Sequence, residues 1–176
     1  KVLRQKLWGV MSVYVVDSNF FIQAHRANYP LDVATSFWGK VKQLAEQKKI
    51  ISIDKVKKEI YDHQDDLKTW CENNLPDDFF KETKGVVASY GQIVSWANSK
   101  NQHYYATAIS EFLDADEADA WLVSFAHADR ANRIIVTHEK SQPDRKNKVK
   151  IPEACAPFGI NYVDTIEMFR QLGESF

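Results

Sequence analysis

Acidic residues stand where two short apolar segments of the sequence end. Val13–Val16 is followed directly by Asp17, and Arg133–Val136 is followed by Thr137-His138-Glu139. Both segments are rich in β-branched residues, which predicts strands that are buried on both faces. Ligands and catalytic groups of a parallel sheet lie just beyond the carboxyl ends of its strands. The two acids, Asp17 and Glu139, therefore predict a metal site at that edge of the sheet.

Two predicted helices bring further carboxylates. Glu59 precedes Ile60 at the border of a buried helix face, although a solvated glutamate paired with Lys55 is the alternative. Asp116 and Asp119 lie three residues apart and would share a face of one helix. Acids in a first helical turn also complement the helix dipole, each contributing about 0.3–1 kcal/mol. That alternative explains Asp116 better than Asp119, which lies deeper in the predicted helix.

Asp17 has an alternative role of its own, because it would also cap the turn into Phe20-Phe21-Ile22. Ser18 and Asn19 follow it, and both carry groups that can orient a carboxylate or a water molecule by hydrogen bonds.

Several carboxylates that converge without a cation repel one another, and their pKa values rise. A divalent cation removes this conflict, and oxygen-only ligands select Mg²⁺ or Mn²⁺ over zinc. Such ions activate water and stabilise the leaving oxygen of a phosphodiester. Basic residues that suit a phosphate backbone lie near the predicted acids, namely Lys55, Lys57 and Lys58 around Glu59, and Arg145, Lys146, Lys148 and Lys150 after Glu139. The alternative for residues 145–150 is a solvated loop.

The length and composition indicate one globular domain. The chain has 176 residues and a formal net charge of −1, so any contact with nucleic acid must rest on local patches. It contains no apolar stretch long enough to span a membrane. Cys71 and Cys155 lack a C-x-x-C partner, which argues against a disulfide framework or a zinc site and favours a reducing cytoplasm. Because Met11 directly precedes the first predicted strand, we interpret residues 1–10 as an expression remnant or upstream extension, and residues 11–176 as the domain.

Helical and strand patterns alternate along this domain. They predict an α/β fold of three layers, with a mostly parallel central sheet of four or five strands flanked by helices. After the first strand we expect a helix over Leu31–Gln47, with Pro30 and Asp32 as its start signals and Val33 and Phe37 on its buried face. A strand over Ile50–Ile53, a helix that Asp54 caps and that runs to about Asn73, and helices over Val86–Ala97, Tyr104–Phe112 and Asp116–Ala128 follow. The domain then has the strand Arg133–Val136, a short helix after Pro152, a strand near Ile160–Val163, and a last helix that Asp164 caps and that stops by Gly173.

The ordered set of acids resembles the pattern of PIN-domain ribonucleases. That family has an Asp after its first strand, as in Val15-Val16-Asp17-Ser18-Asn19, and a Glu in the helix after its second strand, here Glu59. It also has an Asp that opens a helix like Asp119-Ala120-Trp121-Leu122-Val123, and a further acid after the next strand, as in Thr137-His138-Glu139. The Val-Thr-His-Glu stretch and the later Val149-Lys150-Ile151-Pro152 resemble a PIN-like branch of bacterial and archaeal toxins. The resemblance covers most of residues 13–170.

The resemblance implies a PIN-like, Rossmann-like fold and a metal-dependent endoribonuclease that acts on single-stranded RNA. It implies a toxin with a cognate antitoxin protein as partner, and it allows for a homodimer. By this resemblance, the ligands of Mg²⁺ or Mn²⁺ are Asp17, Glu59 and Asp119, and Glu139 completes the acidic set. Asp116 could partly substitute for Glu139. The side chains that would support the ligands or bind the scissile phosphate are Ser18, Asn19 and Thr137. Most of the family has Asp where this chain has Glu139, so the role of this longer side chain is the least defined.

Two other functions compete with this one. A catalytically silent PIN-like module would bind RNA or a protein and use the fold as a scaffold, which the near-neutral net charge favours and the intact acids oppose. A phosphatase with an aspartyl nucleophile usually needs a second Asp two residues after the first, and Asn19 stands there.

Overall fold

A computed structural model describes residues 12–176 of the chain, so the predicted boundary at Met11 and the interpretation of residues 1–10 lie outside the described residues. The centre of the fold is a sheet of five strands in the order β3-β2-β1-β4-β5, in which every neighbouring pair is parallel. The strands are β1 (Val13–Val16), β2 (Ile50–Ile53), β3 (Phe80–Lys81), β4 (Arg133–Val136) and β5 (Tyr162–Val163).

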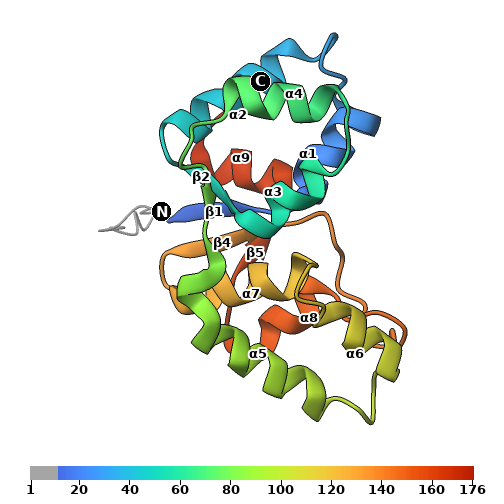
Figure 1. Cartoon of the computed structure of the whole chain (residues 1–176). Coiled ribbons are helices and arrows are strands. Elements are labelled where there is room, and N and C mark those ends of the chain that lie inside the picture. Colours follow the sequence, from blue (N-terminus) through green and yellow to red (C-terminus); the bar gives the residue numbers. More distant parts are fainter. Residues whose placement is uncertain (1–11) are drawn as a thin grey trace.

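Helices cover both faces of the sheet and complete the three layers. In Figure 1, α1, α2, α4 and α9 lie on one side of the sheet and α5, α6, α7 and α8 on the other. The α-helices are α1 (Ser18–Gln23), α2 (Thr35–Glu46), α3 (Asp54–Tyr61), α4 (Asp66–Asn74), α5 (Val87–Ser99), α6 (Ala106–Phe112), α7 (Asp119–Ala128), α8 (Ile151–Cys155) and α9 (Thr165–Leu172), and the shorter turns are η1 (Ala24–Asn28), η2 (Thr83–Val86) and η3 (Ala156–Phe158). The predicted α/β class, with its parallel central sheet between helices, is confirmed.

The central position of β1 sets the geometry of the carboxyl edge. The chain leaves β1 for β2 on one side and later places β4 on the other, so the order of strands reverses next to β1. The register pairs Val16 with Val136, and the N–H of Asp17 donates to the carbonyl of Val136 over 3.1 Å. The residues that follow β1 and β4 therefore emerge side by side, at the place where open α/β sheets bind ligands.

The strands were predicted more accurately than the helices. Both β1 and β2 have the predicted bounds, and so does β4, because each is a short segment dominated by β-branched apolar residues. The strand predicted near Ile160–Val163 is reduced to Tyr162–Val163. The edge strand β3 was not predicted, because Phe80–Lys81 is too short to show a pattern.

The helix predicted over Leu31–Gln47 begins later than expected. Residues 31–33 form a turn, in which the N–H groups of Val33 and Ala34 donate to the carbonyl of Pro30, and α2 begins at Thr35. Val33 is 77% exposed and does not belong to the buried face, whereas Phe37 does. Pro30 and Asp32 were therefore wrong as start signals, because a proline turn can precede a helix without opening it.

The helix predicted from Asp54 to about Asn73 is two helices, α3 and α4. The first helix, α3, ends at Tyr61. Asp65 caps α4 by accepting the N–H of Lys68 over 3.2 Å. The carboxylate of Asp54 does not cap α3 in the predicted way but binds Thr83, whose hydroxyl donates to it over 2.9 Å. The contact ties the start of α3 to the segment that follows β3.

Two further sequence-based expectations concern the membrane and the cysteines. None of the helices within residues 12–176 has the length and apolar character needed to cross a membrane. Cys71 and Cys155 are buried free thiols, and burial raises the pKa of each to about 12. At this pKa both thiols stay protonated at neutral pH and act as small apolar side chains.

The cap of α9 provides a test of the local structure. Asp164 accepts the N–H of Glu167 over 2.8 Å, and the helix ends at Gly173 with a positive φ of 68°, both as predicted. We expect Asp164→Ala to lower the free energy of unfolding by about 1 kcal/mol, and Asp164→Asn to cost only a few tenths, because asparagine also caps helices well. Urea denaturation of the two variants measures this difference, and equal losses would show that the cap does not stabilise α9.

Candidate active site

Asp17 is held at the end of β1 by a local hydrogen bond. It caps α1, and its Oδ1 accepts the N–H of Phe20 over 2.8 Å. The capping role proposed as an alternative is therefore present, but it uses one carboxylate oxygen. The other oxygen, Oδ2, is buried and has no hydrogen-bond partner among residues 12–176, and the whole residue is 3% exposed. A buried carboxylate oxygen without a donor is costly, so this atom favours a ligand.

Asp119 is the first residue of α7, one turn earlier in the helix than its predicted place. The helix predicted from Asp116 begins only at Asp119, so the two acids do not share a helix face. Asp116 stands before the helix with a side chain that is 74% exposed, and its carboxylate pairs with Lys58 over 2.8 Å. The helix dipole therefore favours a charged carboxylate at Asp119, whereas Asp116 is directed away to a surface ion pair.

Glu59 extends from α3 to the start of α7. Its Oε1 accepts the N–H of Ala118, the residue before Asp119, over 3.0 Å. The side chain is partly buried and is not directed to bulk solvent, and the alternative pairing with Lys55 does not occur among the described contacts. Lys55 instead lies over the ring of Trp121, with its Nζ 5.6 Å from the ring centroid.

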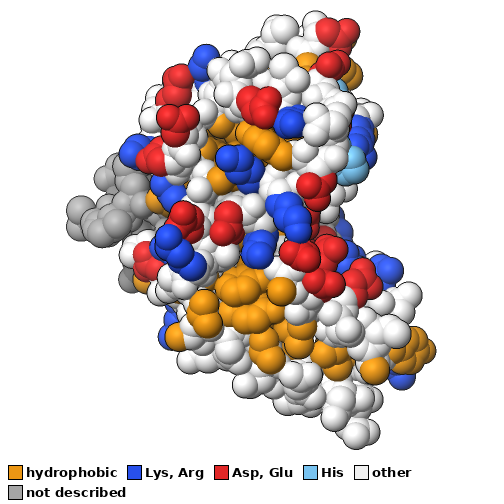
Figure 2. All heavy atoms as spheres, viewed as in Figure 1, with side chains coloured by type: hydrophobic (Ala, Val, Ile, Leu, Met, Phe, Trp, Pro, Cys, Tyr) orange, Lys and Arg blue, Asp and Glu red, His pale blue; other side chains and the backbone are white. Residues whose placement is uncertain are grey.

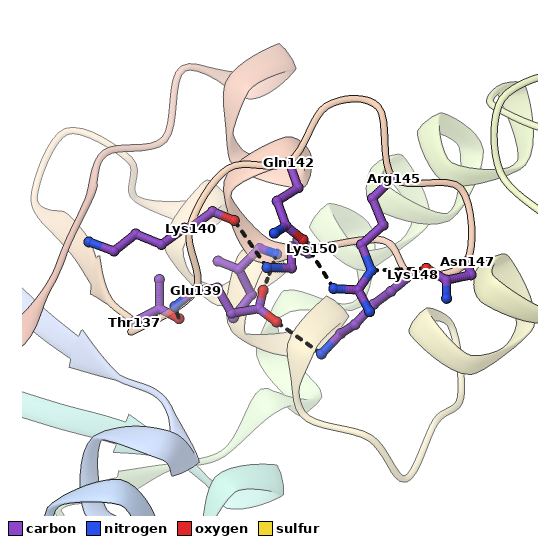
Figure 3. A network of polar contacts seen from close by, with 9 residues as sticks. Thr137, Glu139, Lys140, Gln142, Arg145, Asn147, Lys148 and Lys150 are labelled. Carbon is purple, nitrogen blue, oxygen red and sulfur yellow. Dashed lines mark hydrogen bonds and ion pairs between the residues drawn. The ribbon is translucent and has the colours of Figure 1, made fainter.

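Glu139 follows β4 and has contacts on both carboxylate oxygens. Oε1 lies 2.9 Å from the ammonium of Lys148, and Oε2 accepts the N–H of Ile151 over 2.8 Å (Figure 3). Its own N–H donates to the hydroxyl of Thr137 over 3.2 Å. The side chain of Glu139 is 11% exposed. The polar loop 140–150 thus returns to the end of β4 and does not extend freely into solvent.

Electrostatic coupling connects these four acids. Burial raises the pKa of Asp17 to about 7, and the charges of Glu139 and Glu59 add to the rise. Thr137 and the N–H of Phe20 oppose it. Burial also raises the pKa of Asp119 to about 7. The charges of Glu139, Asp17 and Glu59 add to the rise, and Lys148 opposes it. Two carboxyls that resist ionisation at neutral pH are frequent at functional sites.

The oxygen ligands of these residues are of the type that a hard divalent cation prefers, but their side chains are not arranged around a common point. The donors are all oxygens, and the buried Oδ2 of Asp17 has no hydrogen-bond partner among residues 12–176, which leaves it able to bind a cation. Within residues 12–176, no group of three or more His, Cys, Asp or Glu side chains is placed to hold a metal ion. Binding would therefore require the carboxylates to change rotamer.

The three residues predicted to support the site follow the carboxyl ends of β1 and β4. Ser18 and Asn19 are partly exposed at the start of α1, directly beyond Asp17. Thr137 is 2% exposed, and its N–H donates to the carbonyl of Val163 in β5. Thr137 thus connects the ends of two strands while its hydroxyl faces the acids.

The basic residues divide into those inside and those outside the site. Lys148 lines a cavity of about 70 Å³ together with Asp119, Glu111 and Glu117, between α6 and the start of α7. By contrast, Arg145 binds Gln142 and Asn147 within its own loop, and Lys146 is exposed. The place of Lys148 could not be seen from the sequence, because charge density in a loop does not reveal which side chain turns inward.

Charged side chains gather at the level of the sheet on one face of the molecule. Figure 2 shows acidic and basic groups in a band between the two helical layers, with an apolar area below the band. In α3, the Nζ of Lys57 lies 5.2 Å from the centroid of the Tyr61 ring, and Lys58 pairs with Asp116. Mixed charge, and not a uniformly basic surface, surrounds the acids.

The protein is thus an α/β protein with a parallel sheet, and its electrostatically coupled carboxylates lie where the order of strands reverses. The family model described as a domain of unknown function (DUF4411) matches residues 14–176, and the chain belongs to this family. A search of curated proteins found no match. Among solved structures, the chain is similar to VapBC2 from Rickettsia felis bound to a DNA fragment from their promoter, with 12% identity and a TM-score of 0.47, over 86% of this chain and 98% of that chain. At this distance the likeness supports no argument about function.

The raised pKa values predict how the stability of the metal-free protein depends on pH. A carboxyl with a pKa near 3.8 when unfolded and about 7 when folded stabilises the fold below pH 4, and this contribution is lost as the pH rises through 7. For each such carboxyl, the free energy of unfolding should fall by about 1.4 kcal/mol between pH 6 and pH 8. Urea denaturation in EDTA should show this loss, and Asp17→Asn should reduce it. Asp116→Asn is the control, because Lys58 lowers the pKa of Asp116 and moves its titration below this window. A flat profile between pH 6 and pH 8 would contradict the raised pKa values.

Proposed function

We propose that the protein is a metal-dependent endoribonuclease that hydrolyses phosphodiester bonds in RNA. The observation that carries this proposal is the buried Oδ2 of Asp17, which has no partner and lies in a group of coupled carboxylates at the reversal point of a parallel sheet. A cation is the ligand that such a group lacks, and hydrolysis of phosphodiesters is a common use of carboxylate-held divalent ions. The resemblance of the motifs to PIN-domain ribonucleases points to the same reaction and to RNA.

In this proposal Asp17, Glu59 and Asp119 hold Mg²⁺ or Mn²⁺, with Glu139 in the same acidic set. A bound divalent cation supplies Lewis-acid stabilisation of negative charge on a phosphate oxygen. The amides of Phe20 and Ala118 keep the carboxylates of Asp17 and Glu59 in place and support their charged forms.

Four further side chains complete the proposed mechanism. Thr137 supports Asp17, whose pKa it lowers. Ser18 and Asn19 border the site and orient the phosphate by hydrogen bonds. Lys148 lines the same cavity as Asp119, and its ammonium, which contacts Glu139, can meet the negative charge of the RNA backbone.

The partners follow from the resemblance. We propose that the protein is the toxin of a toxin–antitoxin pair, with a cognate antitoxin protein that blocks the acidic site or its approach. A homodimer is the assembly that the family pattern allows. Co-expression with the product of the adjacent gene, followed by size-exclusion chromatography and an RNA cleavage assay, tests both the partner and the inhibition.

A catalytically silent module that binds RNA or a protein is the second candidate. Two observations favour it, the lack of three metal-binding side chains in position within residues 12–176 and the net charge of −1. Such a module would bind RNA or its partner without cleavage in Mg²⁺ or Mn²⁺. Cleavage that EDTA abolishes distinguishes the two candidates.

Asp17→Asn tests the enzyme directly. The variant keeps the shape and one acceptor of the side chain, so it should fold, cap α1 and lose metal-dependent RNA cleavage by more than about 100-fold, because metal stabilisation contributes several kcal/mol to such a reaction. Cleavage of single-stranded RNA is measured in Mn²⁺ and in EDTA, with circular dichroism as a check of folding. Asp32→Asn, an exposed acid before α2, is the matched control. A folded Asp17→Asn variant with full activity would exclude Asp17 as a ligand.

The basic residues of the loop that lie outside the acidic site should contribute to RNA binding and not to turnover. Lys146 and Lys150 are the targets, because Arg145 has two side-chain contacts within the loop and Lys148 belongs to the acidic site. Lys150 is half-buried and has one such contact, from its ammonium to the carbonyl of Lys140 over 3.1 Å. We expect Lys146→Gln with Lys150→Gln to weaken RNA binding and to reduce the slope of log K against log salt by about 1.4, since each phosphate contact to a single strand contributes about 0.7. The turnover rate at saturating RNA should change little.

The matched control for this pair is a double variant at the opposite edge of the sheet. Lys42→Gln with Lys48→Gln removes the same charge from α2 and from the segment before β2. This control should leave the salt dependence unchanged. If the loop variant also has an unchanged slope, residues 140–150 are a solvated connection, and the RNA backbone follows α3 along Lys55, Lys57 and Lys58.

A further inference from the structure

Glu139 differs from the other three acids, because both of its carboxylate oxygens already have strong partners. Its Oε1 lies 2.9 Å from the ammonium of Lys148, and its Oε2 accepts the N–H of Ile151 over 2.8 Å. Asp17, by contrast, leaves Oδ2 without any described partner. A divalent cation could bind the Oδ2 of Asp17 without displacing another group. At Glu139 it would have to displace the ammonium of Lys148, which is already in contact.

The chain fixes Lys148 in this position. Val149 and Ile151, which follow it, are each 1% exposed and anchor the end of the loop in the core. The Lys148 side chain is only 38% exposed, and Figure 3 shows it reaching back from the loop to Glu139. Lys140, on the same loop, is 81% exposed and lies 4.0 Å from Asp164, away from this contact. Lys148 is thus a partly buried positive charge in contact with Glu139, and it differs in this from the exposed Lys140.

We propose that Lys148 takes the place of a second metal ion, so that the site binds a single divalent cation on the Asp17 side while Glu139 positions the lysine. This inference rests on the proposed metal-dependent function. A second cation at Glu139 would lie beside the ammonium and be repelled by it, since like charges in a partly buried site are weakly screened. Glu139 is then a positioning residue, and the Lys148 ammonium is the group that meets a phosphate oxygen of the RNA.

Calorimetric titration with Mn²⁺ alone, without RNA, tests the inference. The wild-type protein should bind one Mn²⁺ per chain, and Glu139→Gln should still bind one, because the ion lies on the Asp17 side. Lys148→Met should admit a second Mn²⁺ or bind the single ion at least about tenfold tighter, because the competing positive charge is gone. Lys148→Arg keeps that charge and should behave as wild type. Lys140→Met is the control, since it removes an exposed charge from the same loop, and it should leave Mn²⁺ binding unchanged.

Three results would overturn the inference and leave the proposed function standing: two ions bound by the wild type, loss of binding in Glu139→Gln, or Mn²⁺ binding by a folded Lys148→Met variant that matches wild type in number and affinity. Failure of the wild-type protein to bind any Mn²⁺ would refute the metal-dependent function and the inference with it. Thermal unfolding of each variant in EDTA shows whether it is folded. Lys148→Gln replaces Lys148→Met if the methionine variant does not fold.

Discussion

Burial of negative charge at the carboxyl edge of the sheet is the constraint on which the rest of this structure depends. Three of the carboxylates accept a backbone N–H. Asp17 binds the amide of Phe20, while Glu59 and Glu139 bind amides at the start of α7 and α8. Amide dipoles stabilise an anion only in part, because they carry no net charge. Burial raises the pKa of both Asp17 and Asp119 to about 7. Lys148 supplies the one full positive charge that contacts a member of the group in the described part of the chain.

The same helix and strand ends that bring these amides together also hold the sheet in register. The N–H of Asp17 bonds to the end of β4, and the N–H of Thr137 bonds to β5, so the acids follow strand ends that hydrogen bonds hold side by side. Such attachment keeps the carboxylates near one another although they repel, since the free energy that opposes the repulsion comes from the core around them.

The sequence predicted the strands and the acids but not the details that determine how each acid is used. Continuous apolar runs such as Val13–Val16 leave few alternatives, and Asp164 with Gly173 bounded the last helix correctly. The start of α7 at Asp119 was missed, because residues 114–118 contain no proline or glycine to interrupt a helical pattern. The pairing of Lys148 with Glu139 crosses an irregular loop, and neither helical nor strand periodicity reports a contact of that type.

Glu139 stands where the PIN-domain pattern that the sequence resembles has Asp, and its contact with Lys148 gives the longer side chain a physical role. The additional methylene lets the carboxylate extend beyond the end of β4 to the N–H of Ile151 and the ammonium of Lys148 at the same time. A shorter side chain would have to give up one contact or draw the loop inward, and buried Val149 resists such a shift. The longer acid and the inward lysine therefore form a single feature, and a change in one of them has consequences for the charge of the whole site.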